Sequence, residues 1–314
     1  MGMELKQACE RVVESCSKAI VGKEEAIRLI FTSFLCSGHV LLEDVPGTGK
    51  TMLLRAFART VGCEFKRIQF TPDLLPSDLT GINFYNQKTG EFEFRPGPLF
   101  TNMVLADEIN RATPRTQSSL LEAMEEHQIT VDGTTYPLAA PFFVMATQNP
   151  VESYGTFPLP EAQLDRFFMK LSLGYMAREQ EMAVLTRKPT VDILQEITPV
   201  MTMEEIAALK QAYHAVRMEK DVLGYLMDIV ERTRQESRFV IGVSTRGAIA
   251  LYQASQVTAA FAGREYVMPE DIKYVAPYVL SHRITSRGQE SFADAQAYLR
   301  RILEEIPVPV ERIS

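Results

Sequence analysis

The chain has 314 residues, and 33 Lys and Arg against 40 Asp and Glu give it a formal net charge of −7. Hydrophobic residues make up 46% and charged residues 23%, which are globular values and exclude a disordered or fibrous chain. The acidic balance argues against a broad nucleic-acid-binding surface, which would show as a basic excess. The length predicts about two domains.

Cysteine usage and the lack of targeting signals favour a cytoplasmic protein. Cys9, Cys16, Cys36 and Cys63 include no CxxC pair and no zinc-finger spacing, so we expect buried free thiols. The N-terminal residues carry charges every few positions and lack the apolar segment of a signal peptide. No run approaches the ~20 apolar residues of a transmembrane helix, so we expect no membrane insertion.

The first part of the chain alternates strand-like and helix-like segments. Short apolar runs, typical of strands buried on both faces, occur at residues 40–42, 68–70, 103–106 and 142–146. Helical patterns lie between them, from Thr51 to Val61 and from Pro114 to about Glu126. Alternating units of this kind predict an α/β fold in which a parallel sheet lies between helices.

Two segments interrupt this alternation and predict β-hairpins inserted into the layered core. Residues 82–86 and 91–95 flank a loop that ends in glycine, and residues 128–131 and 134–138 flank Asp132-Gly133. The first hairpin carries alternating aromatic residues, which either grip a substrate or pack the hairpin against the core: Phe84, Tyr85, Phe92 and Phe94.

After about Pro189 the strand patterns give way to helical ones. Thr202 and Glu205 form a capping box at the start of one helix. Further helices are predicted at residues 221–237, 244–261, 269–282 and 291–305. We therefore expect an αβα core at residues 1–190, followed by a small all-helical domain at residues 191–314.

The most specific motif is DVPGTGKT at residues 44–51, which follows a predicted strand and opens a helix. Glycines let backbone N–H groups turn inward around phosphate oxygens, and the start of the helix adds partial positive charge. Lys50 is predicted to reach the β and γ phosphates of ATP, and Thr51 to bind Mg²⁺. The expected nucleotide contacts are Pro46, Gly47, Thr48, Gly49, Lys50, Thr51 and Met52.

Two features of this loop limit its interpretation. Asp44 stands where the pattern has its first glycine, although Asp tolerates turn geometry. Met52 stands where a dinucleotide-binding fingerprint needs its third glycine, so that alternative fails.

Acidic and amide residues follow two other predicted strands. Asp107 and Glu108 end the apolar run at 103–106, and we expect Asp107 to bind Mg²⁺ and Glu108 to activate the attacking water as a general base. Asn149 follows the run at 142–146, where its amide is predicted to orient that water. An ordinary loop residue before Pro150 is the alternative for Asn149.

Two arginines are candidates for contacts with a nucleotide. Arg166 precedes an apolar strand and is predicted to act in trans on a γ-phosphate; the alternative is a salt bridge with Asp165 or Glu161. Arg246 lies at a predicted helix start, where it either contacts nucleotide and couples the domains or is a solvated first-turn residue. On the first reading, hydrolysis changes the Arg246 contact and swings the helical domain against the core.

These residues together resemble the MoxR family of AAA+ ATPases. The phosphate loop contributes to the resemblance, but two longer blocks make it specific: LADEINRATPRTQSSLLEAMEE at 105–126 and PFFVMATQNPVESYGTFPLPEAQLDRFFMK at 141–170. The resemblance extends from residue 20 to the helical lid. It implies that Lys50 and Thr51 belong to Walker A, Asp107 and Glu108 to Walker B, and Asn149 to sensor 1. It likewise implies that Arg166 is the arginine finger and Arg246 is sensor 2.

The resemblance also carries implications for assembly and partners. It implies a ring, usually a hexamer, with ATP between neighbouring subunits. It further implies chaperone-like work on partner complexes, often with von Willebrand factor A-domain proteins. The two hairpins correspond to the helix-2 insert and the pre-sensor-1 hairpin of that clade.

Two functions from other classes stay open at this point. One is a nucleic-acid motor of the same clade, which the charge of −7 disfavours. The other is a nucleotide-gated scaffold that does not hydrolyse ATP. The intact set of Lys50, Asp107 and Glu108 disfavours the scaffold.

Overall fold

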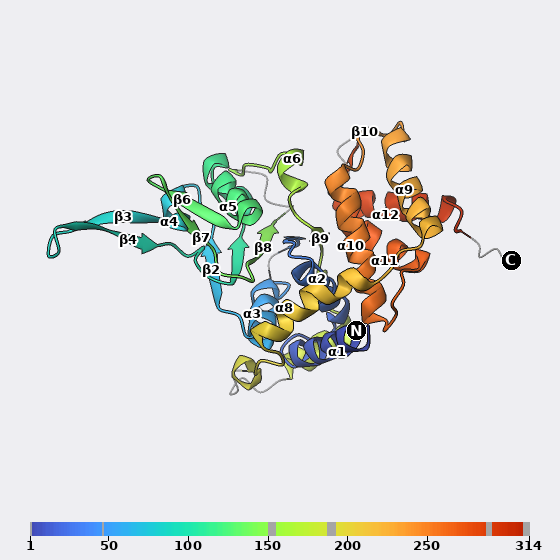
Figure 1. Ribbon diagram of the computed structural model, residues 1–314, viewed down its shortest axis with the longest axis horizontal. Helices are drawn as coiled ribbons and strands as arrows, with labels where there is room; N and C mark the ends of the chain where they lie inside the picture. The colour runs from blue at the N-terminus through green and yellow to red at the C-terminus, as the bar shows by residue number, and fades with distance from the viewer. Residues whose placement is uncertain (1, 46, 150–154, 187–192, 287–290, 310–314) are drawn as a thin grey trace.

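A computed structural model describes residues 2–45, 47–149, 155–186, 193–286 and 291–309 (Figure 1). Its centre is a five-stranded parallel sheet in the order β2-β5-β8-β1-β9. The strands are β1 (Val40–Glu43), β2 (Phe65–Gln69), β5 (Met103–Asp107), β8 (Phe143–Gln148) and β9 (Met169–Leu171). The predicted parallel sheet is thus confirmed, and β9 is the apolar strand expected after Arg166.

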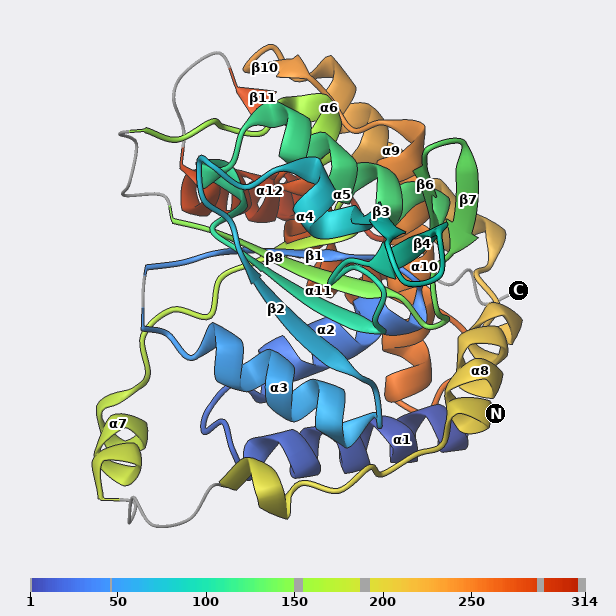
Figure 2. The same cartoon turned by 90° about the vertical axis from the view of Figure 1, so that its left-hand side faces the viewer.

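Helices cover both faces of the sheet because side chains alternate along each strand. Val40 and Leu42 point into one buried cluster with helices α2 and α3, whereas Leu41 points into a second cluster with α5. Figure 2 shows α2 and α3 on one side of the sheet and α5 on the other. The bounds are α2 (Glu24–Leu35), α3 (Lys50–Thr60) and α5 (Pro114–Glu126).

Both predicted hairpins are present. One, between β3 and β4, extends far from the core, and the other lies against its base (Figure 1). Gly81 is required at the base of the first hairpin, since a Cβ there would lie 2.3 Å from the Arg95 carbonyl oxygen. The elements are α4 (Pro76–Thr80), β3 (Gly81–Asn86), β4 (Glu91–Pro96), β6 (Gln128–Val131) and β7 (Thr134–Pro137).

Packing explains one of the hairpin aromatics, and the gripping role stays a prediction for the others. The ring of Phe94 stacks on Tyr136 of the second hairpin, with centroids 4.1 Å apart, and so packs the two hairpins together. Phe92 and Tyr85 contact each other edge to face but stay exposed. Packing therefore accounts for Phe94 and leaves the outer aromatics available to a partner.

The C-terminal part is a helical lid, with one difference from the expectation. Each predicted helix is present, including the capping box in which the Glu205 N–H donates to Thr202 Oγ1 at 3.2 Å. The lid also contains a two-stranded antiparallel sheet, so it is not purely helical. The elements are α8 (Met203–Ala212), α9 (Lys220–Gln235), β10 (Phe239–Ile241), α10 (Thr245–Phe261), α11 (Pro269–Leu280), β11 (Thr285–Ser286) and α12 (Phe292–Glu305).

The lid packs closely on the first helices of the chain. Helix α1 packs against α10, and the rings of Phe31 on α2 and Phe261 on α10 stack with centroids 5.4 Å apart. One buried apolar cluster therefore runs from the sheet into the lid. The remaining elements are α1 (Gly2–Ser17), α6 (Glu161–Leu164), α7 (Arg178–Leu185) and the 3-10 turns η1 (Ile109–Arg111), η2 (Ile193–Glu196) and η3 (Tyr213–Ala215).

All four cysteines are free, as expected, although Cys36 is only partly buried. Burial raises the pKa of the Cys9 and Cys16 thiols to about 11. None of the helices in the described part of the chain is long and apolar enough to cross a membrane.

Candidate nucleotide-binding site

The phosphate-loop sequence forms an open turn between β1 and α3. Gly47 and Gly49 have φ angles of +86° and +87°, in the region that favours glycine. A Cβ on Gly47 would meet nothing within 4 Å, so space is open above the loop. No side chain caps the start of α3, which leaves its first N–H groups directed at that space. Pro46 lies outside the described residues.

A cavity of about 490 Å³ brings together residues from three of the predicted groups. Gly47, Gly49, Lys50, Thr51 and Met52 line it from the loop and from α3. Asp107, Glu108 and Asn149 line it from the carboxyl ends of β5 and β8. These ends meet because β1, β8 and β5 are parallel neighbours in the sheet.

The adjacent acids Asp107 and Glu108 have different hydrogen-bond partners. Asp107 accepts hydrogen bonds from Arg67, at 2.6 Å to Nη2 and 3.1 Å to Nε, and from Thr147 Oγ1 at 2.7 Å. Glu108 has a positive φ of 57°, and its N–H donates to the same Thr147 hydroxyl at 2.9 Å. The Glu108 carboxylate accepts from Gln69 Nε2 at 2.9 Å and from Arg111 Nη1 at 3.1 Å.

Sequence reasoning missed Arg67, Gln69 and Thr147. Arg67 and Gln69 are two positions apart on the edge strand β2, so both point to the cavity side. Thr147 directly follows the apolar run of β8. All three lie near the carboxyl ends of parallel strands, where ligands bind in such sheets, and that position could have predicted them.

Asp44, the departure from the glycine pattern, has a structural explanation. Its buried carboxylate accepts hydrogen bonds from Ser172 Oγ at 2.9 Å, the Leu173 N–H at 2.6 Å and the Gly174 N–H at 3.0 Å. Lys23 Nζ donates to carbonyl oxygens of the same segment, including that of Leu173 at 2.5 Å. Asp44 thus fastens the start of the phosphate loop to the chain that leaves β9, while its carbonyl accepts from Lys50 Nζ at 3.1 Å.

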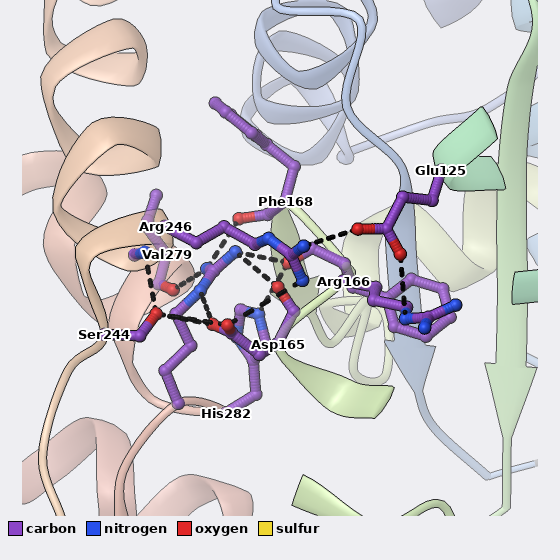
Figure 3. Close-up of polar contacts among 11 residues, drawn as sticks. Glu125, Asp165, Arg166, Phe168, Ser244, Arg246, Val279 and His282 are labelled. Atoms are coloured by element: carbon purple, nitrogen blue, oxygen red, sulfur yellow. Dashed lines mark hydrogen bonds and ion pairs between the residues drawn. The ribbon is translucent and has the colours of Figure 1, made fainter. Parts of the chain in front are cut away.

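Arg166 and Arg246 do not line this cavity. They lie together on another part of the molecule, where both form ion pairs with Glu125 at the end of α5 (Figure 3). The Arg166 guanidinium therefore pairs with Glu125 rather than with Asp165 or Glu161. The structure brings the two predicted arginines to each other and not to the chain's own phosphate loop.

A buried arginine that the sequence did not indicate supports this second cluster. Arg283 is almost fully buried and donates to Asp165 Oδ1 at 2.8 Å and to the Phe167 carbonyl at 2.6 Å. It also donates to the carbonyls of Phe168 and Val279. Burial lowers the pKa of Arg283 to about 10, and Asp165 opposes that shift, so the guanidinium stays charged at neutral pH.

The donors around the cavity fit a nucleoside triphosphate with Mg²⁺. Thr51 offers a hydroxyl and Asp107 a carboxylate, which are the hard oxygen ligands that Mg²⁺ prefers. Lys50 and the uncapped N–H groups of α3 offer positive charge to phosphates. The open space at Gly47 provides room for them.

Comparison with known proteins agrees with this arrangement. Residues 39–169 match the model of the ATPase family associated with various cellular activities (AAA), and residues 231–306 match the AAA lid domain. The chain is 51% identical over 304 residues to the uncharacterized protein YeaC of Bacillus subtilis, covering 96% of this chain and 95% of that protein.

Two further relatives cover nearly all of the chain. Chaperone MoxR1 of Mycobacterium tuberculosis is 38% identical over 316 residues, or 96% of this chain and 82% of that protein. A solved structure from Cytophaga hutchinsonii, assigned as an ATPase, is 38% identical and superposes with a TM-score of 0.89 over 98% of this chain and 97% of that one. The chain therefore belongs to the MoxR family of AAA+ ATPases.

Proposed function

We propose that this protein hydrolyses ATP at a site that a neighbouring subunit completes, and that it uses the energy to remodel partner protein complexes. One observation carries the proposal. The phosphate loop, both acids and Asn149 converge on one cavity, whereas Arg166 and Arg246 lie together outside it. A complete site then needs the arginines of another copy.

Each side chain of the cavity has a role in this proposal. Gly47, Gly49 and Lys50 bind the phosphates, and Thr51 and Asp107 would hold Mg²⁺. When bound, Mg²⁺ would neutralise charge on the β and γ phosphates. Arg67 already pairs with the Asp107 carboxylate and so would share or yield that oxygen.

Glu108 and Asn149 are proposed to act on the attacking water. Glu108 accepts its proton as a general base, and the Asn149 amide orients it without adding charge. Gln69 and Arg111 hold the Glu108 carboxylate to one side of the cavity. Both donors bind Glu108 Oε2, so we propose that Oε1 accepts the proton from the water.

Arg166 and Arg246 are proposed to reach the γ-phosphate of the neighbouring subunit. Arginine supplied in trans stabilises the charge of the transition state and is worth roughly 10³–10⁵ in rate. Sites of this type form in closed rings with heterologous contacts, and we propose a hexamer.

The biological role is proposed from the family. The relative named Chaperone MoxR1 supports chaperone-like work on other proteins. A von Willebrand factor A-domain partner, the client complex and a cytoplasmic location stay predictions of the resemblance and the composition. The alternatives, a nucleic-acid motor and a non-hydrolysing scaffold, gain no specific support from the site.

Replacement of Glu108 tests the catalytic assignment. Glu108→Gln keeps the size and hydrogen-bonding capacity of the side chain but removes the base. We expect ATP turnover to fall by about 10²–10⁴-fold, the usual contribution of a general base, while ATP affinity measured by calorimetry stays within about threefold. Glu122→Gln on α5 is the control, because Glu122 lies outside the cavity. Unchanged turnover in Glu108→Gln would reject the assignment.

A further inference from the structure

One carboxylate holds both candidate trans-acting arginines. Arg246 Nη2 lies 2.5 Å from Glu125 Oε1, and Arg166 Nε lies 3.2 Å from Glu125 Oε2. Each guanidinium therefore uses a different oxygen, and Figure 3 shows the Glu125 carboxylate linking the two. The three residues come from the end of α5, the turn after α6 and the first turn of α10.

Local charge explains why Arg246 needs this partner. It lies in the first turn of α10, where the helix dipole disfavours a cation. The nearby acid Asp165 is already engaged, because it accepts from Arg283 Nε at 2.8 Å and from the Ser244 hydroxyl at 3.1 Å. Arg246 Nη1 is 4.0 Å from Asp165, so Glu125 supplies the shorter contact.

Exposure separates the permanent arginine of this cluster from the exchangeable ones. The side chain of Arg283 is 2% exposed, whereas those of Arg166, Arg246 and Glu125 are 33%, 49% and 36% exposed. Exposed ion pairs are weak and exchange readily with other anions. An open cavity of about 460 Å³ adjoins Glu125 and Arg166, so a ligand can approach them.

We propose that Glu125 is a positioning residue that occupies the place of the neighbour's γ-phosphate until that phosphate arrives. The proposal rests on the proposed function above. Glu125 keeps the two guanidinium groups adjacent in the free subunit, and it competes with the phosphate for them. A γ-phosphate offers more charge and more acceptor oxygens than one carboxylate and therefore displaces Glu125 when two subunits meet around ATP.

Competition between Glu125 and the γ-phosphate predicts the direction in which a Glu125 variant changes subunit association. Removing the charge of Glu125 frees both arginines, so subunits that carry a triphosphate should associate more tightly. ADP has no γ-phosphate, so association in ADP should not respond. A residue that merely fastened the lid to the core would show the opposite sign, because its loss would loosen the surface that the neighbour contacts.

Sedimentation velocity of the full chain with Mg²⁺ and AMP-PNP, a triphosphate analogue that resists hydrolysis, provides the test. We expect Glu125→Gln to lower the protein concentration at the assembly midpoint by about threefold to tenfold, the scale of two exposed ion pairs. Glu125→Ala should shift it in the same direction. In ADP the midpoints of wild type and both variants should agree within about twofold.

Glu122→Gln is the matched control. Glu122 lies one helical turn before Glu125 and lines the same 460 Å³ cavity, so the variant removes an equal charge from the same place. In the described structure, Glu122 forms no ion pair with either arginine. Its midpoint should match that of wild type, which separates ion pairing from general charge around the cavity.

The possible results separate the role of Glu125 from the existence of a shared ATP site. A midpoint in AMP-PNP that is unchanged or raised in Glu125→Gln overturns the role of Glu125, and so does a shift of equal size in Glu122→Gln. If wild-type protein stays monomeric in AMP-PNP at every concentration, the shared site of the proposed function fails, and the role of Glu125 fails with it. Thermal melting of each variant verifies that it is folded.

Discussion

Asp44 shows how a residue that departs from a motif can stabilise the loop that the motif forms. Its side chain accepts three hydrogen bonds from residues 172–174, and its carbonyl accepts one from Lys50. A glycine would retain only the carbonyl contact. The carboxylate therefore connects the phosphate loop to the chain beyond β9, and the lysine contact itself does not depend on it.

Asp44→Gly should destabilise the protein although it restores the usual glycine. The change removes the acceptor of the buried Leu173 N–H, which costs about 1–3 kcal/mol when left unsatisfied, and of the partly buried hydrogen bonds from Gly174 and Ser172. We expect the free energy of unfolding, measured in urea, to fall by about 3 kcal/mol after partial relaxation. Asp44→Asn, which keeps one carbonyl oxygen, should lose less. Wild-type stability in Asp44→Gly would contradict the structural role.

At the scale of elements, the sequence predicted those helices and strands that depend on apolar patterns and helix-start residues within a short segment. The strands β1, β5 and β8 contain predicted apolar runs and end in polar residues, and α5 begins at Pro114 and ends at Glu126 as expected. The strands β10 and β11 have only three and two residues, too few to produce a periodic signal.

Contacts between distant segments could not be predicted in this way. Arg283 follows a helix end, where sequence alone suggests a solvated arginine, yet it binds Asp165, which is 118 positions away in the chain. The place of Arg246 likewise depends on how the lid packs against α1 and α2, and no pattern near residue 246 encodes that. The sequence therefore indicated the phosphate-loop residues together but not where the arginines point.

Buried and exposed arginines of the same cluster should differ sharply in their contribution to stability. Arg283→Met removes the guanidinium that donates to the Asp165 carboxylate and to four backbone carbonyls, and loss of one partner from a buried pair costs about 3–5 kcal/mol. Arg246→Met, at an exposed pair, should cost about 1 kcal/mol or less. Equal losses in urea unfolding would contradict the division into permanent and exchangeable arginines.

At the scale of the whole molecule, the lid and the core share one buried cluster. Helix α1 packs against α10, and the Phe31 and Phe261 rings stack across the junction. The swing of the helical domain that the sequence predicts would have to alter this packing, and it stays a prediction. We expect nucleotide-dependent motion to occur mainly between subunits, at the face that carries Arg166 and Arg246.

The long β3–β4 hairpin is an extension of the molecule that is anchored at its base. It extends away from the sheet and the lid, and its outer aromatic residues are exposed (Figure 1). Its inner end is fixed by the stacking of Phe94 on Tyr136. A movement of the core therefore reaches the hairpin through its base.

A mixing experiment tests the central claim, an ATPase site shared between subunits, most directly. Lys50→Ala should lose phosphate binding and Arg166→Ala the trans-acting cation, so each variant alone should hydrolyse ATP at least about 10²-fold more slowly than wild type. In an equal mixture, a productive site needs an intact loop in one subunit and an intact arginine in the next, so about a quarter of the sites should work if the subunits mix at random in a ring. Recovery of activity on mixing is the predicted result; a mixture that stays as inactive as its components, while wild type hydrolyses ATP, would contradict a shared site.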